Sequence, residues 1–267
     1  MTQKLQNRPI LFSVVFTLVI AIGMGITQML IRALFVPNSL QLSATLASVA
    51  WIVLSIVAVM FLGAINQING FKFVFSSNGF AKGILACVPL VVFFAFNLIV
   101  RIINVESMTF ENPGGFTMVA LMQAIAAFLQ NIVFRGLLIT ALFVKYSEKE
   151  NDRVKSILKA SALYLLAYIP LSILNTGGVE LMQLVNTFVV GAGMCGAYMY
   201  SKNLLSLTLV QGVWHILGVA IDFFGIEESV QASLLMLAVL LNIWVIIIVG
   251  AVVFGKRAKV FSFLKAN

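Results

Sequence analysis

The sequence contains few residues that can ionise. Its 267 residues include 17 lysines and arginines, nine aspartates and glutamates and one histidine, so that 10% of the chain is charged. Soluble domains carry about 25% charged residues. Hydrophobic residues reach 61% of this chain, which excludes an ordinary soluble domain. Repeated apolar runs long enough to span a bilayer instead indicate an integral membrane protein.

Cysteine and histidine are also scarce. The two cysteines, Cys87 and Cys195, both lie inside apolar runs, and the chain has no CxxC pair and no histidine-rich segment. Disulfide frameworks and structural metal sites both need several such residues at short, regular spacings. The sequence therefore predicts no disulfide scaffold, no metal site and no other cofactor.

Acidic residues are too few to balance the basic ones, which leaves a net charge of +8. An excess of this size can indicate a nucleic-acid partner. Here, however, the cations lie at the ends of apolar runs, where membrane topology explains them. We therefore predict contact with membrane lipids and no nucleic acid.

Linkers, internal repeats and low-complexity segments are absent from the sequence. The longest segments between apolar runs are 65–83, 104–116 and 145–156, none of which could form a separate soluble domain. The sequence thus predicts a single membrane domain over 1–267, with any function located inside the helices or on short loops.

The apolar runs have the length of membrane-spanning helices. A helix needs about 20 apolar residues to cross a hydrocarbon core of about 30 Å. Only helices and closed barrels satisfy every backbone polar group in lipid, and runs of this length indicate helices. The predicted fold is all-α, a polytopic membrane helical bundle with about eight transmembrane helices. The predicted spans are 9–31, 40–64, 84–103, 117–144, 157–174, 181–200, 204–221 and 230–254.

Basic residues also predict the orientation of the bundle, because cytoplasmic loops are enriched in lysine and arginine. With both termini in the cytoplasm, all but three of the 17 cations lie on the cytoplasmic side. The exceptions are Arg32 and Arg101, near outer helix ends, and Arg135, inside a span. The cytoplasmic cations are Lys4, Arg8, Lys72, Lys82, Lys145, Lys149, Arg153, Lys155, Lys159, Lys202, Lys256, Arg257, Lys259 and Lys265.

Arg135 is the most informative residue of the chain, because charge elsewhere is confined to the ends of the apolar runs. An arginine at membrane depth is costly and normally faces a partner or a wet cavity. Asn131 lies four residues earlier, on the same helix face, and Gln130 lies alongside it. The run 117–144 therefore carries a polar stripe.

Two later runs carry polar residues at the same helical spacing. Tyr164 and Tyr168 are one turn apart in one run, and Gln211 and His215 are one turn apart in another. Counted from the basic residues at the span ends, the polar groups of all three runs fall in one layer of the membrane. Polar groups in lipid associate with each other, so we predict one internal cluster. Its members are Gln130, Asn131, Arg135, Tyr164, Tyr168, Gln211 and His215.

These residues resemble the motifs of the CPBP family of membrane proteins, the CAAX prenyl proteases and bacteriocin-processing proteins that are also called Abi proteins. The family pattern is Glu-Glu-x-x-x-Arg on one helix, Phe-x-x-x-His on the next and His-x-x-x-Asn on a later one. The resemblance covers 117–220. The matching segments here are Gln130-Asn131-Ile132-Val133-Phe134-Arg135, Tyr164-Leu165-Leu166-Ala167-Tyr168 and Gln211-Gly212-Val213-Trp214-His215.

The chain departs from the family at the positions that carry chemistry. In the family, a glutamate activates water, and histidines stabilise an oxyanion or hold a metal. Here Gln130 and Asn131 replace the glutamates, while Tyr168 and Gln211 replace the histidines. An amide has no basic group near neutral pH, so it cannot act as a general base. We therefore expect that no catalytic residue of the family mechanism is intact, apart from the arginine.

The resemblance implies a multi-pass protein of a bacterial cell membrane. Our first hypothesis is a catalytically inactive relative that binds a membrane or envelope protein or peptide, as a scaffold, a regulator or a bacteriocin-immunity protein. A second is an intramembrane CAAX-type endopeptidase of altered chemistry, with His215 as its base and activity that rises with pH near about 6–7. A third is a small transporter, which the lack of ionisable groups and of a repeat disfavours.

Overall fold

The structure is a computed structural model that describes residues 9–35, 40–65, 77–103, 113–139, 150–176, 181–223 and 243–245. Apart from short turns at 77–79 and 202–203, every described residue is helical, which confirms the predicted all-α bundle. The helices are α2 (Pro9–Phe35), α3 (Leu40–Ile65), α5 (Phe80–Ile103), α6 (Pro113–Gln130), η2 (Asn131–Ile139), α8 (Glu150–Thr176), α9 (Leu181–Ser201) and α10 (Leu204–Phe223).

These helices coincide with the first seven predicted spans, with α6 and η2 together forming the fourth. Of the eighth predicted span, 230–254, only residues 243–245 belong to the described part of the chain. One described helix, Gly114–Ile139, has the length and apolar composition that are needed to cross a bilayer. Shorter apolar stretches are Val14–Ile26, Ser48–Ala58 and Leu204–Leu217. That every helix crosses the membrane stays a prediction.

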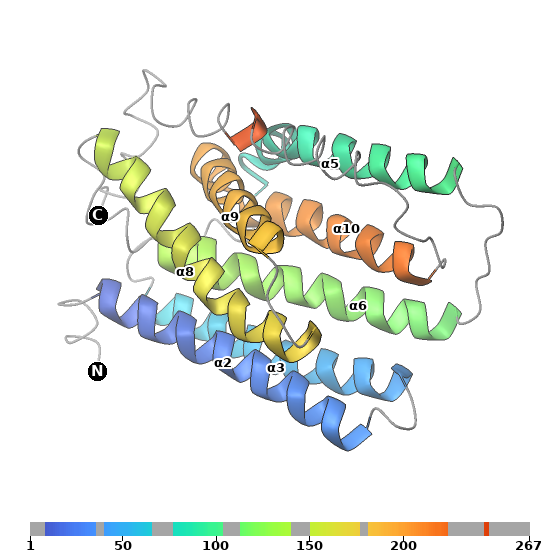
Figure 1. Cartoon of the computed structure of the whole chain (residues 1–267). Coiled ribbons are helices and arrows are strands. Elements are labelled where there is room, and N and C mark those ends of the chain that lie inside the picture. The colour runs from blue at the N-terminus through green and yellow to red at the C-terminus, as the bar shows by residue number, and fades with distance from the viewer. Residues whose placement is uncertain are drawn as a thin grey trace.

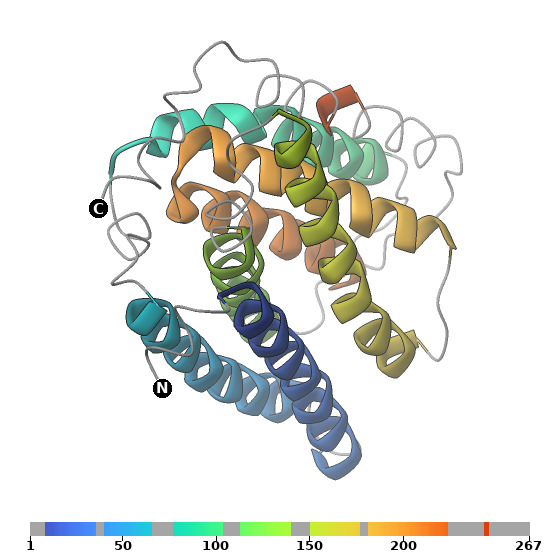
Figure 2. The same cartoon turned by 90° about the vertical axis from the view of Figure 1, so that its left-hand side faces the viewer.

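Helix α6 occupies the middle of the bundle. It packs against α3 on one side and α10 on the other, and α10 in turn packs against α5 (Figure 1). Helix α8 contacts both α9 and α2. Figure 2, turned by 90°, shows the same order, with α2 and α3 on one side of the molecule and α5 on the opposite side. The segment η2 continues α6 and contacts α2, α3, α8, α9 and α10. Residues on η2 therefore lie where most of the helices meet.

The outer surface of the helices is apolar. Large aliphatic side chains are exposed on several helices, including Val19 and Ile22 on α2, Ile56 on α3 and Leu209 on α10. Soluble proteins rarely expose large contiguous apolar patches. Exposed aliphatic side chains on separate helices are typical of a bundle that is surrounded by hydrocarbon.

Small residues allow close contact between the helices. A Cβ added at Gly191 would lie 2.9 Å from Cδ1 of Tyr164 on α8, and one added at Gly193 would overlap the ring of Trp244. The indole N–H of Trp244 donates a hydrogen bond to the Ala86 carbonyl at 2.7 Å. Trp244 therefore contacts both α9 and α5. It is the best-packed residue of the short described segment 243–245.

The turn between α9 and α10 is fixed to the start of α5. Asn203 accepts a hydrogen bond from the Ser206 backbone N–H at 2.8 Å, so it caps α10, and its Nδ2 donates to the Asn78 carbonyl at 3.1 Å. This places Lys82 and Lys202 at the same end of the bundle, as the charge pattern predicts. Burial, with the nearby Lys82 cation as the smaller cause, lowers the pKa of Lys202.

Candidate functional site

The site begins where α6 changes its helical pattern. The sequence predicts one helix over 117–144, whereas α6 ends at Gln130 and the chain continues as the nine-residue π-helix η2 to Ile139. Residues 140–144 lie outside the described part. A π-helix uses i→i+5 bonds, is rare, and occurs often at functional sites. At the junction of α6 and η2, Nδ2 of Asn131 donates a hydrogen bond to the Ala127 backbone carbonyl at 2.8 Å.

All nine residues of η2 are buried, including Arg135, which is 0% exposed. Its Nη1 donates to Oε1 of Gln211 at 3.4 Å. Its guanidinium lies 5.0 Å from the centre of the Tyr164 ring, close enough for a cation–π interaction. Within the described residues, Nε and Nη2 have no hydrogen-bond partner, and no carboxylate contacts this cation. Arg135 is therefore held by an amide and an aromatic ring, without a counter-ion from those parts of the chain.

Gln211 on α10 is the centre of the polar cluster. Its Oε1 accepts hydrogen bonds from Arg135 and, at 2.9 Å, from Nδ2 of Asn131. Its Nε2 donates to Oε1 of Gln130 and lies 3.5 Å from Nε2 of His215. Gln211 is itself 1% exposed. Gln211 thus contacts four of the other six residues that the sequence places in the cluster.

Arg135 and Asn131 together set the direction of the hydrogen bonds around Gln211, because the Ala127 carbonyl holds Nδ2 of Asn131 as a donor. A guanidinium can only donate, so the carbonyl end of Gln211 must face Arg135 and its amide nitrogen must point the other way. That nitrogen needs acceptors, and it meets the carbonyl oxygen of Gln130 and the ring nitrogen of His215. His215 therefore accepts at Nε2 and carries its proton on Nδ1 in the neutral form.

The Tyr164 side chain closes the network on the α8 side. Its hydroxyl donates to Oε1 of Gln130 at 3.2 Å, so this oxygen accepts from both Tyr164 and Gln211. The ring of Tyr164 also meets Phe134 edge to face, with centroids 4.8 Å apart. Tyr164 is thus held by three contacts: the Phe134 ring, the Arg135 guanidinium and the Gln130 amide oxygen.

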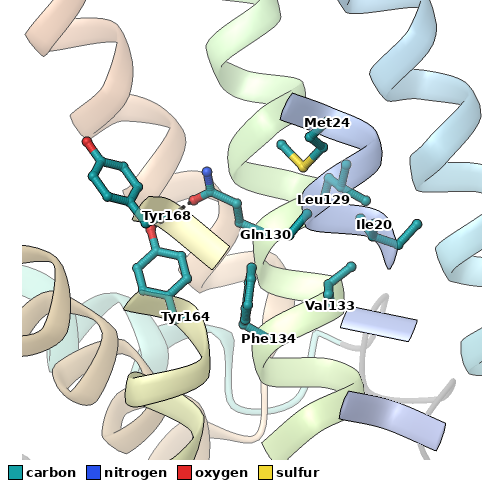
Figure 3. A pocket seen from close by; sticks show the side chains of 9 residues that line it. Ile20, Met24, Leu129, Gln130, Val133, Phe134, Tyr164 and Tyr168 are labelled. Carbon is teal, nitrogen blue, oxygen red and sulfur yellow. Dashed lines mark hydrogen bonds between the residues drawn. The ribbon is translucent and has the colours of Figure 1, made fainter. Parts of the chain in front are cut away.

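Tyr168 lies beside this network. It lines a pocket together with Gln130 and Tyr164 (Figure 3), while the hydrogen bonds described above do not include it. The structure therefore joins six of the seven selected residues through close polar contacts and places the seventh next to them. The role of these residues in function stays a prediction.

Sequence reasoning missed the contribution of α2. Ile20, Ala21 and Met24 line the pocket opposite the tyrosines, yet no polar residue or motif distinguishes them in the sequence. Aliphatic side chains at helical spacing look the same whether they face lipid, another helix or a pocket. Only the packing of α2 against η2 and α8 identifies them.

The fold and the site define a class, an integral membrane helical bundle with a polar cluster buried among apolar helices. A family model described as type II CAAX prenyl endopeptidase Rce1-like matches residues 112–217. This segment runs from the start of α6 into α10 and includes all seven selected residues. Residues 112–217 are thus similar to the type II CAAX prenyl endopeptidases, over less than half of the chain. No curated protein matches the chain, and no solved structure matches it.

The donor set of this chain does not suit the metal that the family resemblance implies. Zinc sites use several thiolate, imidazole or carboxylate ligands. The cluster instead offers amide oxygens, tyrosines, one arginine and one imidazole, and the described residues include no group of three or more His, Cys, Asp or Glu side chains placed to share an ion. The arrangement is suited to hydrogen bonding with a neutral ligand, and the described residues place no carboxylate in it to activate water.

Proposed function

We propose that this protein is a catalytically inactive CAAX-protease-like membrane protein that binds a partner. The observation that carries the proposal is the amide at the centre of the cluster. Gln211 connects Gln130, Asn131 and Arg135 at positions where the family has its glutamates, its arginine and a histidine. The same polar layer thus has a hydrogen-bonding role in place of an acid–base role.

The hydrogen bonds of Gln130 support this assignment. A general base must have a lone pair free for the proton that it removes. Gln130 is an amide, and its oxygen already accepts from Tyr164 and Gln211. His215 is the one side chain of the cluster with a basic nitrogen, and that nitrogen faces the Gln211 amide. No carboxylate of the described residues orients this histidine or activates a water beside it.

The partner follows from the location of the site. A buried polar cluster in an apolar bundle is accessible to molecules that share the membrane, so we expect a membrane or envelope protein or peptide. The excess of basic residues at predicted cytoplasmic ends and the family resemblance favour a multi-pass protein of a bacterial cell membrane. Roles as a scaffold, as a regulator or in immunity to a bacteriocin all use binding without turnover.

The test combines an activity assay with co-purification. Purified full-length protein is incubated with prenylated and with hydrophobic peptides, and cleavage is followed by mass spectrometry. We expect no cleavage above the level of an Arg135→Ala variant, and we expect a membrane protein or peptide to co-purify from native membranes. Turnover that is lost in Arg135→Ala or His215→Ala would refute the proposal and favour an endopeptidase of altered chemistry.

A further inference from the structure

Two lysines from distant parts of the chain lie together at one end of the bundle. Lys82 is in the first turn of α5, and Lys202 is in the turn between α9 and α10. The helices that follow them, α5 and α10, pack against each other and run side by side (Figure 1). Burial, and in smaller part the nearby Lys82 cation, lowers the pKa of Lys202. The fold therefore brings two like charges close to each other.

Close contacts hold the two segments that carry these lysines. A Cβ added at Gly83 would overlap the Ser206 side chain, so α5 and α10 touch directly beside Lys82. Nδ2 of Asn203 donates to the Asn78 carbonyl at 3.1 Å, which ties the residue after the second lysine to the segment before α5. The backbones of both lysines thus belong to one contact region, and neither can move away without breaking it.

A cation pair of this kind is complementary to an anion with several acceptor atoms. Two cations repel each other, and an anion placed between them is attracted by both. An ammonium group has three donors and no acceptor, so a phosphate can accept hydrogen bonds from both lysines at once. Lys82 is exposed and Lys202 is partly buried. The pair can therefore be reached from outside the bundle.

The residues next to the lysines distinguish a lipid phosphate from a soluble one. An exposed leucine follows each lysine by three residues, Leu85 on α5 and Leu205 on α10. Both leucines lie where the predicted spans 84–103 and 204–221 begin, next to the level at which lipid headgroups are expected. A soluble anion gains nothing from apolar surface, whereas a phospholipid carries acyl chains beside its phosphate. Lysines at this level attract anionic lipids.

We propose that Lys82 and Lys202 together bind the phosphate group of an anionic phospholipid, whose acyl chains lie in the hydrocarbon around Leu85 and Leu205. This assignment goes beyond the proposed function, because the lipid binds at the end of the bundle and does not contact the polar cluster. It also gives the two like charges a common counter-ion.

The test is native mass spectrometry of the full-length protein in detergent. The protein is titrated with phosphatidylglycerol and, separately, with phosphatidylcholine that carries the same acyl chains. We expect the first bound phosphatidylglycerol to be held more tightly than the first phosphatidylcholine. One lysine near a lipid surface contributes a factor of about five, so Lys82→Gln and Lys202→Gln are each expected to weaken phosphatidylglycerol binding ~5-fold. The double variant is expected to bind both lipids equally.

Matched variants control for net charge and for folding. Lys159→Gln, at an exposed position of α8, removes the same charge elsewhere and is expected to leave the first binding step nearly unchanged. Lys202→Arg keeps the cation and is expected to bind phosphatidylglycerol as the wild type does. Binding of phosphatidylcholine serves as the internal control in every variant, and melting in detergent shows that each variant is folded.

Several outcomes would overturn the proposal. Equal affinity of the wild type for both lipids would remove the selectivity for an anion. An equal effect of Lys159→Gln would replace the pair by a general effect of positive charge, and an effect of only one of the two lysines would remove the shared site. Displacement of the lipid by inorganic phosphate would assign the pair to a soluble anion, and displacement by an acidic peptide would assign it to a protein partner.

Discussion

Arg135 gives a set of neutral side chains a fixed direction. Amides of glutamine and asparagine can donate or accept at either end, so a network made only of amides has several arrangements of similar energy. A guanidinium has only donors. Arg135 donates to Oε1 of Gln211, as does Asn131, whose Nδ2 also donates to the Ala127 carbonyl. These donors orient the Gln211 amide, which then orients Gln130 and His215. The retained arginine therefore has a structural consequence even without the acids that accompany it in the family.

Replacing Gln211 tests this role directly. Gln211→Leu leaves Arg135 and Asn131 without their shared acceptor, and a buried donor left without an acceptor costs about 1–3 kcal/mol, more when the donor is charged. Gln211→Glu keeps the acceptors and adds a counter-charge, while the Gln130 amide can turn to donate. We expect the leucine variant to melt well below the wild type in detergent, and the glutamate variant at or above it.

Leu209, an exposed residue on the same helix, provides the control for the two Gln211 variants. Leu209→Ala is expected to change the melting temperature little, because surface substitutions away from specific contacts have small effects. Equal melting temperatures for the leucine and glutamate variants would show that Arg135 does not depend on position 211.

A second residue-scale prediction uses the geometry of the cluster to build a metal site. Histidines four residues apart on one helix and a carboxylate from a neighbouring helix form a common zinc ligand set. The double variant Gln130→Glu and Gln211→His, together with native His215, supplies that set, since these side chains lie within contact distance. We expect the purified variant to retain zinc, as measured by atomic spectrometry.

The matched control adds His215→Ala to the double variant and is expected to lose the zinc. If the double variant retains no more zinc than the wild type, the three side chains do not converge as described.

At the scale of elements, the helices themselves were predictable and their internal irregularities were not. Long apolar runs indicate α2, α3, α5, α6, α8, α9 and α10, because a backbone in lipid must satisfy its own hydrogen bonds. The change from α6 to η2 was not predictable, since residues 131–139 have ordinary helix-forming composition. Within this segment Asn131 and Arg135 contact Gln211 on α10, and no local pattern encodes that contact.

The turn from α9 to α10 carries strain that a substitution can relieve. Lys202 has φ of 59°, a left-handed conformation that costs a side-chain-bearing residue roughly 1 kcal/mol relative to glycine. We expect Lys202→Gly to raise the melting temperature in detergent by a few degrees. Lys202→Ala is the control, because it removes the charge but keeps the strain, and it is expected to stabilise less than glycine does.

At Gly79, just before α5, we expect a substitution to destabilise the protein. Gly79 has φ of +77°, and a Cβ there would overlap the Ser201 backbone carbonyl. Gly79→Ala is therefore expected to lower the melting temperature by more than Lys202→Gly raises it. Tolerance of alanine at position 79 would contradict the close contact between α5 and the α9–α10 turn.

At the scale of the whole molecule, Trp244 joins helices that are distant in sequence. Its indole donates to Ala86 of α5 and its ring covers Gly193 of α9. Trp244→Phe keeps most of the buried area and loses the hydrogen bond, a cost of about 1 kcal/mol. Trp244→Ala also leaves a cavity, for a cost of about 3–5 kcal/mol.

Unfolding of the two variants in detergent, followed by circular dichroism, checks this order. Ile243→Ala, at the exposed neighbouring position, is the control and is expected to unfold like the wild type. Similar stability for Trp244→Ala and the control would show that this segment does not hold the bundle together.

The sequence by itself determined the class of protein, the course of the described helices and the residues that form the polar cluster. These features follow from local quantities, namely the length of apolar runs and the scarcity of polar groups inside them. Tertiary structure alone decided that Arg135 pairs with Gln211, that η2 is a π-helix, and that α2 completes a pocket beside Gln130. Those features depend on which faces of separate helices meet. The sequence does not predict these contacts, because aliphatic side chains look alike whether they face lipid, another helix or a pocket.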